Sequence, residues 1–190
     1  TDSSSNPLIL VTGHFVSIRD LRLMNSYASQ ADTLPIIQVG SASVGPGYFE
    51  ISSCDVWNYP TVKGTGIDFQ SSGAATVSNN RFYETKYGIR MRNLVNPDGG
   101  DDLITGNWFV MGSVNGTYGI YQESSGGLKV VDNKFWGWQY PFYLDRSNTA
   151  PTGQLTISRN SFDGFQGSSS GGTGVTLTRS SGTGQYEGYI

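Results

Sequence analysis

The chain has 190 residues, enough for one domain with a hydrophobic core, and its charged fraction of 14% is too low for a disordered segment. No apolar run is long enough for a membrane span, so we expect no membrane insertion. The formal net charge of −3, with scattered lysines and arginines, argues against nucleic acid as a partner. The single cysteine, Cys54, excludes an internal disulfide.

A motif of the form apolar-x-x-Asn-x-apolar recurs along the chain. Two copies without the Asn begin at positions 18 and 51, and four full copies begin at 77, 104, 130 and 157. The starts are therefore 33, 26, 27, 26 and 27 residues apart. Such a period is typical of a solenoid, whose repeats stack on one another. We expect residues 1–14 to form a lead-in or cap and residues 15–190 to form the solenoid, as a fragment of a longer chain.

A second motif, Gly-apolar-x-apolar, lies between these copies. It begins at Gly66, Gly88 and Gly174, with looser copies at Gly119 and Pro141. The alternation of apolar and other residues indicates strands with one buried face, and no segment shows a capped helical periodicity. The sequence therefore predicts an all-β fold, a right-handed parallel β-helix of about six coils.

The repeat also predicts which side chains stack on equivalent ones in the next coil. Four phenylalanines should stack inside, with Leu23 and Val56 extending their row: Phe82, Phe109, Phe135 and Phe162. Four asparagines should form a ladder at one bend, with Cys54 as a buried thiol in the same column: Asn80, Asn107, Asn133 and Asn160. Asparagine tolerates the left-handed backbone that such a bend needs, and its amide can bond the equivalent amide one coil away.

These stacked bends resemble those of the pectate-lyase-like β-helix superfamily, over roughly residues 15–180. Because the chain shows neither a signal peptide nor disulfides, bacteriophage tailspikes are favoured within that group. The resemblance implies a homotrimer in the virion tail that binds, and often cleaves, bacterial surface polysaccharide such as capsule or lipopolysaccharide O-antigen. A secreted or cell-surface protein is the alternative location. No local sequence motif of the family identifies a particular catalytic residue in this chain.

Outward positions of the Gly-apolar-x-apolar strands combine acids, arginines and tyrosines, a mixture suited to sugar processing. We propose catalytic roles for Glu123, Asp145 and, in reserve, Asp68, with hydrolysis favoured over elimination. The candidate substrate-binding residues on this face are Arg90, Arg92, Tyr121 and Tyr143. The alternative is a solvated charge ladder in which Arg92 pairs with Glu123.

The short strand after each Asn bend has its own outward column. Its aromatic members, Trp57, Tyr83 and Trp136, are candidates for substrate binding, for a subunit interface, or for burial under loops. No zinc-ligand spacing or phosphate-binding loop is present, so we expect no metal and no cofactor. Two functions stay open: a polysaccharide depolymerase, or a non-catalytic receptor-binding or structural module of a phage fibre or bacterial adhesin.

Overall fold

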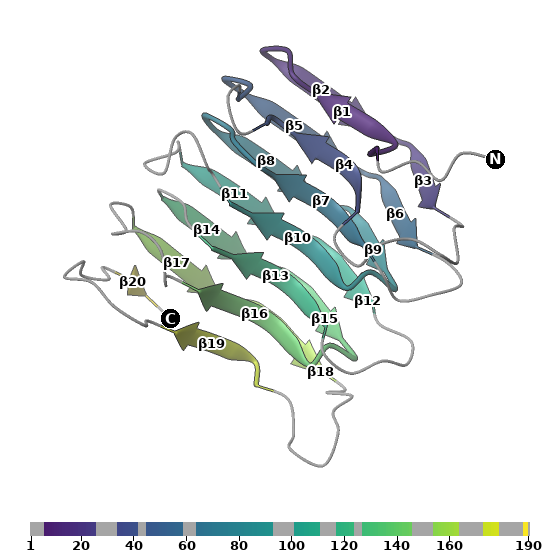
Figure 1. Ribbon diagram of the computed structural model, residues 1–190. Helices are drawn as coiled ribbons and strands as arrows, with labels where there is room; N and C mark the ends of the chain where they lie inside the picture. Colours follow the sequence, from purple (N-terminus) through teal and green to yellow (C-terminus); the bar gives the residue numbers. More distant parts are fainter. Residues whose placement is uncertain are drawn as a thin grey trace.

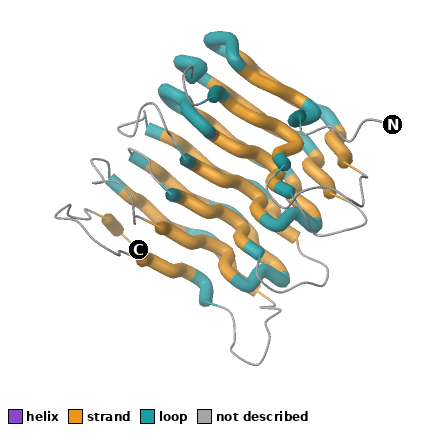
Figure 2. Tube along the Cα trace, in the orientation of Figure 1, coloured by secondary structure: helices purple, strands orange, loops and turns teal. Residues whose placement is uncertain are grey.

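The computed structural model describes residues 6–25, 34–41, 45–58, 64–92, 101–110, 117–123, 127–145, 154–163, 173–178 and 188–189. Within these ranges every regular element is a strand, as the tube trace shows (Figure 2). None of the described segments forms a helix that is long and apolar enough to cross a membrane. The prediction of an all-β chain is therefore confirmed for the part that the structure describes.

The strands form three parallel sheets. The first sheet contains β1 (Ile9–Val11), β4 (Pro35–Val39), β7 (Thr65–Phe69), β10 (Tyr87–Met91), β13 (Tyr118–Gln122), β16 (Tyr140–Asp145) and β19 (Val175–Thr178). The second contains β2 (Val16–Arg19), β5 (Phe49–Ser52), β8 (Ala75–Ser78), β11 (Asp102–Thr105), β14 (Leu128–Val131), β17 (Leu155–Ser158) and β20 (Gly188–Tyr189). The third contains β3 (Arg22–Asn25), β6 (Asp55–Asn58), β9 (Arg81–Tyr83), β12 (Trp108–Val110), β15 (Lys134–Trp136) and β18 (Ser161–Asp163).

The first six coils each contribute one strand to each sheet, and strands three places apart along the chain pair in parallel. The coils therefore stack in sequence order from the N-terminal to the C-terminal end (Figure 1). Seven strands in each of two sheets and six in the third correspond to the predicted parallel β-helix of about six coils. Strand β1 lies within residues 1–14, the predicted lead-in, and already forms the edge of the first sheet by pairing with β4.

Apolar side chains from all three sheets fill the interior of the coil. The predicted phenylalanine row is present: the rings of Phe82 and Phe109 stack with their centroids 4.8 Å apart, and those of Phe109 and Phe135 are 4.6 Å apart. Phe162 continues the row, 5.3 Å from Phe135. Register is thus fixed by inward side chains that repeat from coil to coil.

The predicted asparagine ladder also forms. The side-chain Nδ2 of Asn80 donates to Oδ1 of Asn107 at 3.1 Å, and Nδ2 of Asn107 donates to Oδ1 of Asn133 at 3.0 Å. Asn160 continues the ladder, since its Oδ1 accepts from Nδ2 of Asn133 at 3.0 Å. Cys54 occupies the column as predicted; it is 1% exposed, and its backbone N–H donates to Oδ1 of Asn80.

The reason given for asparagine at this bend was wrong in one respect. The residue with positive φ is the one before the ladder position: Asp20, Ser53, Asn79, Gly106, Asp132 and Arg159, with φ between 53° and 65°. The ladder asparagines are therefore not the left-handed residues. Their role is to bond backbone and side-chain groups of neighbouring coils, which a bend without regular ladder hydrogen bonds would otherwise leave unpaired.

Candidate functional site

The outer face of the first sheet carries the predicted column of polar side chains. Pairing of successive strands places Gln38 opposite Asp68, Asp68 opposite Arg90, Arg90 opposite Tyr121, and Tyr121 opposite Tyr143. Thr176 follows Tyr143 on the last strand. From Gln38 to Tyr143 the inward neighbours on both sides of each of these residues are buried, so the alternation predicted from the sequence holds here; beside Thr176, on the last strand of the sheet, Leu177 is exposed.

Glu123 and Asp145 lie on adjacent coils, as predicted. Gln122 of β13 pairs with Leu144 of β16, and the two acids are the next residues along their chains. Neighbouring strands are roughly 4.8 Å apart, so the two backbones lie close together. Asp68 is the exception among the three predicted acids, since its side chain is only 1% exposed.

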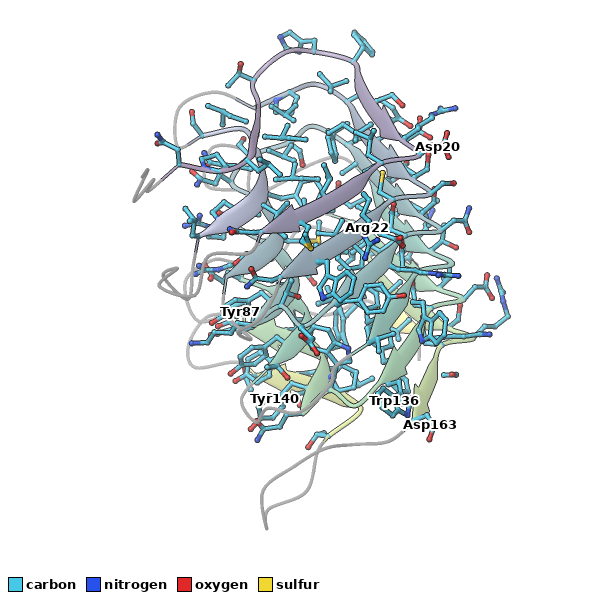
Figure 3. All side chains as sticks on the ribbon, turned by 90° about the vertical axis from the view of Figure 1, so that its right-hand side faces the viewer. Asp20, Arg22, Tyr87, Trp136, Tyr140 and Asp163 are labelled. Atoms are coloured by element: carbon cyan, nitrogen blue, oxygen red, sulfur yellow. The ribbon has the colours of Figure 1, made fainter. Side chains whose placement is uncertain are left out.

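A further column of tyrosines, which the sequence prediction missed, lies beside this one. Tyr87, Tyr118 and Tyr140 begin successive strands, and their backbones are paired in register. Together with Tyr121 and Tyr143 they form a group of five, called here the tyrosine cluster. All five are partly exposed, and Figure 3 shows Tyr87 and Tyr140 at the same side of the stack.

The rings of the tyrosine cluster form two interlocked stacks. In one, the centroids of Tyr87, Tyr118 and Tyr140 are spaced by 5.1 Å in both steps, with interplanar angles of 7° and 17°. In the other, Tyr121 and Tyr143 stack at 5.3 Å and 6°. Contacts between the two stacks are edge to face, at angles of 72° to 80°. Both geometries are favourable for aromatic pairs, so each ring of the cluster is stabilised by contacts with its neighbours.

Charged side chains border the tyrosine cluster and are engaged with one another. Arg90 Nε donates to Oε1 of Glu123 at 2.6 Å, and Arg90 also forms an ion pair with this carboxylate through Nη2. Arg92 Nε donates to Oδ1 of Asp68 at 3.0 Å, and its Nη2 bonds Oδ2. The alternative that paired Arg92 with Glu123 was therefore wrong about the partner, because the guanidinium that holds Glu123 is that of Arg90.

Two phenol groups of the cluster, those of Tyr121 and Tyr118, have a raised pKa. Burial raises the pKa of Tyr121 well above its usual range, and the hydrogen bond that its hydroxyl donates to Oδ2 of Asp145, 3.0 Å long, raises it further. Burial also raises the pKa of Tyr118, with contributions from the neighbouring tyrosines and Asp145. The environment of these two hydroxyl groups therefore favours their neutral form.

The third sheet carries the second predicted row. Its outward column is in register as expected, and it contains Met24, Trp57, Tyr83, Val110, Trp136 and Asp163. The ring centroids of Trp57 and Tyr83 are 5.5 Å apart, and the guanidinium of Arg22 lies 4.8 Å from the Trp57 ring. Val110 separates this pair from Trp136, which is 41% exposed. The row is thus two aromatic patches rather than one continuous strip.

Two tryptophans that the sequence places near the third sheet have different environments. Trp108 is 44% exposed, with the Arg81 guanidinium 5.5 Å from its ring. Trp138 is fully buried and packs edge to face on Phe109, so it belongs to the core. Among the described residues there is no group of three or more histidine, cysteine or acidic side chains that could hold a metal ion.

The stacked sheets, the interior ladder and the aromatic outer faces define a parallel β-helix domain. A family model described as the right-handed β-helix region matches residues 36–188, and the chain belongs to this family. Membership supports the pectate-lyase-like superfamily and, in general terms, a module that binds carbohydrate, depolymerises it or has a structural role. No curated protein and no solved structure matches the chain.

Proposed function

We propose that this chain is a β-helix segment of a bacteriophage tailspike and binds a bacterial surface polysaccharide on the outer face of the first sheet. The observation that carries the proposal is the tyrosine cluster, which places five partly exposed aromatic side chains on one face. Aromatic and hydroxyl groups together suit sugars, whose rings have apolar faces and polar edges. Because the coils stack in one direction, the face extends along the axis that a polymer would follow (Figure 1).

Binding is better supported than cleavage because the three candidate acids are already engaged. Glu123 accepts hydrogen bonds from Arg90, Asp68 accepts from Arg92, and Asp145 accepts from Tyr121. A general acid must instead hold a proton and direct it at the glycosidic oxygen. The geometry therefore favours these carboxylates as groups that position the arginines and the Tyr121 hydroxyl.

Tyr143→Ala tests the proposed binding face. It removes a ring and a hydroxyl from the first sheet, and affinity for the bound polysaccharide should fall by about tenfold, as expected for an aromatic contact of 1–1.5 kcal/mol. Trp136→Ala, on the third sheet, is the matched truncation of an exposed aromatic residue. Equal affinity of parent and Tyr143→Ala for every bacterial polysaccharide that the parent binds would refute the assignment of the face.

The row on the third sheet supports a different role, namely contact between subunits of a homotrimer. Figure 3 shows Trp136 and Tyr140 at different sides of the stack, so both surfaces can be engaged at once. Trp136 is exposed, and large exposed aromatic side chains are enriched at subunit interfaces. Trp136→Ala should reduce the oligomer mass measured by light scattering while Tyr143→Ala leaves it unchanged. An unchanged mass for Trp136→Ala would count against this contact.

Hydrolysis by Glu123 and Asp145 is the second candidate function, favoured by their position on adjacent coils. Carboxyl groups about 5 Å apart are typical of retaining glycosidases, and separations of about 6.5–9.5 Å are typical of inverting ones. In that case Glu123→Gln and Asp145→Asn should keep the fold and lower the depolymerisation rate by orders of magnitude. If the parent shortens a polysaccharide and both variants do so at the same rate, these acids are not catalytic.

A further inference from the structure

The charged groups around the tyrosine cluster compensate one another. The described cations that contact the cluster or its acids are Arg90, Arg92 and Lys86, whose ammonium lies 5.9 Å from the Tyr87 ring centroid. The acids are Asp68, Glu123 and Asp145, so three positive groups face three negative ones and the formal sum is zero. Among the described residues, the face therefore offers no excess positive charge to an anionic sugar.

The two guanidinium groups are also bound to carboxylates of the protein. The side chains of Arg90 and Arg92 are only 19% and 22% exposed, and each is bound to its carboxylate through both Nε and Nη2. A uronate or phosphate group could bind the edge of Arg90 formed by Nε and Nη2 only by displacing Glu123, which would leave that acid partly buried without its partner. Such an exchange is unfavourable, because a carboxylate loses its paired cation in an environment where it is poorly hydrated.

Within the cluster, the faces of the tyrosine rings are largely covered by neighbouring tyrosine rings. Tyr118 has Tyr87 on one face and Tyr140 on the other, each 5.1 Å away. One face of Tyr121 is covered by Tyr143 in the same way. A ligand above the sheet therefore meets ring edges and hydroxyls more than ring faces, and sugar stacking is confined to the ends of the two stacks.

Hydroxyl groups then remain as the main means of recognition. The phenols of Tyr87, Tyr118 and Tyr143 make no hydrogen bond to another described residue, whereas that of Tyr121 is bound to Asp145. Since the rings of Tyr87, Tyr118 and Tyr140 are almost parallel, their hydroxyls recur at about the coil spacing of 5 Å. Each phenol can donate one hydrogen bond and accept others, as sugar hydroxyls do.

We infer that the tyrosine cluster binds an uncharged, hydroxyl-rich polysaccharide through its phenol hydroxyls, and that it does not recognise an acidic one through the two arginines. This inference rests on the proposed function of the face. Arg90 and Arg92, which the sequence predicted as substrate-binding residues, are then internal partners of Glu123 and Asp68 rather than ligands for an anionic sugar.

Two sets of bacterial polysaccharides of matched size test this inference, one built only of uncharged sugars and one bearing uronate groups. Affinities are measured by calorimetry at low and high sodium chloride. Binding should be found in the uncharged set and should change less than about twofold between the two salt concentrations, because no net ion pair forms. Tyr143→Phe keeps the stacked ring and removes only its hydroxyl, and it should weaken binding by a factor of about 3 to 10. Tyr48→Phe, which makes the same change beside the second sheet, is the control and should match the parent.

Three results would overturn the inference in different ways. Binding confined to the uronate set and weakened by salt would show recognition of charge, while the proposed function would stand. Parent-like affinity of Tyr143→Phe together with weak binding by Tyr143→Ala would show ring stacking instead of hydroxyl recognition. Absence of binding to both sets would refute the inference and the proposed function together.

Discussion

The side chain of Asn107 makes four hydrogen bonds and lies between two buried ladder asparagines, Asn80 and Asn133. Its Oδ1 accepts from the backbone N–H of Asn80 at 2.9 Å and from Nδ2 of Asn80 at 3.1 Å. Its Nδ2 donates to the carbonyl oxygen of Val77 at 2.8 Å and to Oδ1 of Asn133 at 3.0 Å. The residue is 1% exposed, so water cannot easily replace these bonds.

Asn107→Ala should therefore lower the free energy of unfolding by about 4 kcal/mol. Four hydrogen bonds are lost, and each contributes about 1 kcal/mol net when its partner stays buried. The backbone conformation of the bend adds nothing to this value, because the positive φ of 65° belongs to Gly106 and not to Asn107. Alanine at position 107 meets no backbone strain.

Equilibrium unfolding in urea, followed by far-ultraviolet circular dichroism, measures this loss. Asn160→Ala is an internal comparison, since Asn160 makes three such side-chain bonds at the partly exposed end of the ladder and should be less affected. Lys129→Ala, an exposed change on β14, should match the parent within about 0.5 kcal/mol. The denaturant slope must be equal in all variants for the comparison to hold. A loss below 1 kcal/mol for Asn107→Ala, with an unchanged slope, would refute the reasoning that the ladder stabilises the stack.

Three other changes are predicted from single contacts. Gln122 is fully buried with no partner for its amide among the described residues, so Gln122→Leu should raise the free energy of unfolding by about 1–2 kcal/mol in the same urea assay. A Cβ on Gly119 would lie 2.5 Å from the carbonyl oxygen of Pro141, so Gly119→Ala should lower it by about 2–3 kcal/mol, and a parent-like midpoint would contradict this close approach. Burial raises the pKa of Tyr121 in the folded state above the unfolded value of about 10. The free energy of unfolding is therefore unaffected by this group below about pH 10 and falls as the pH rises above that value, because the unfolded state loses the proton first. Tyr121→Phe should therefore flatten the fall in stability at alkaline pH; an identical pH profile for both proteins would exclude this contribution.

The period of the sequence was enough to predict the fold because the residues that repeat are those that face the core. Phe109 and Phe135 must repeat at a fixed interval if they are to stack, and a one-residue slip would turn both outward. The asparagine ladder was predictable for the same reason, since Asn107 can bond Asn133 only if both occupy one position of the coil. Which residue takes the left-handed backbone was not predictable from the repeat, because it varies in type along that column.

The tyrosine column was missed because strand alternation fails at its N-terminal side. Simple alternation puts Tyr87 on the same face as Ile89, which is fully buried. In the structure a Cβ on Gly88 would meet the Phe109 ring at 2.9 Å, so Gly88 faces the core as well. Two consecutive inward residues shift Tyr87 to the outside, and the same happens before Gly119. The recurring Tyr-Gly-Ile of residues 87–89 and 118–120 was the signal that could have revealed it.

Partner choice among charged side chains is the other feature that the sequence could not supply. The columns place Arg90 and Arg92 within reach of acids on neighbouring coils, but register alone allows several pairings. The actual pairing is diagonal: Arg90 reaches Glu123 on the next coil, and Arg92 reaches back to Asp68 on the preceding one. In this arrangement Nε and Nη2 of each arginine bind an acid of the protein, so this edge of the guanidinium cannot hold a substrate anion while both acids stay paired.

The diagonal pairing also bears on whether Glu123 and Asp145 can act as a catalytic pair. A glycosidase needs one carboxyl group that gives up a proton and a second that attacks or activates water. Glu123 accepts hydrogen bonds from two donors of Arg90, and Asp145 accepts a hydrogen bond from the Tyr121 hydroxyl. Cleavage would require the Arg90–Glu123 ion pair to open when the polysaccharide binds. An uncharged polysaccharide carries no ionic group that could take the place of Arg90 or Glu123 when this ion pair opens. The contacts that favour binding of a neutral glycan therefore oppose its hydrolysis.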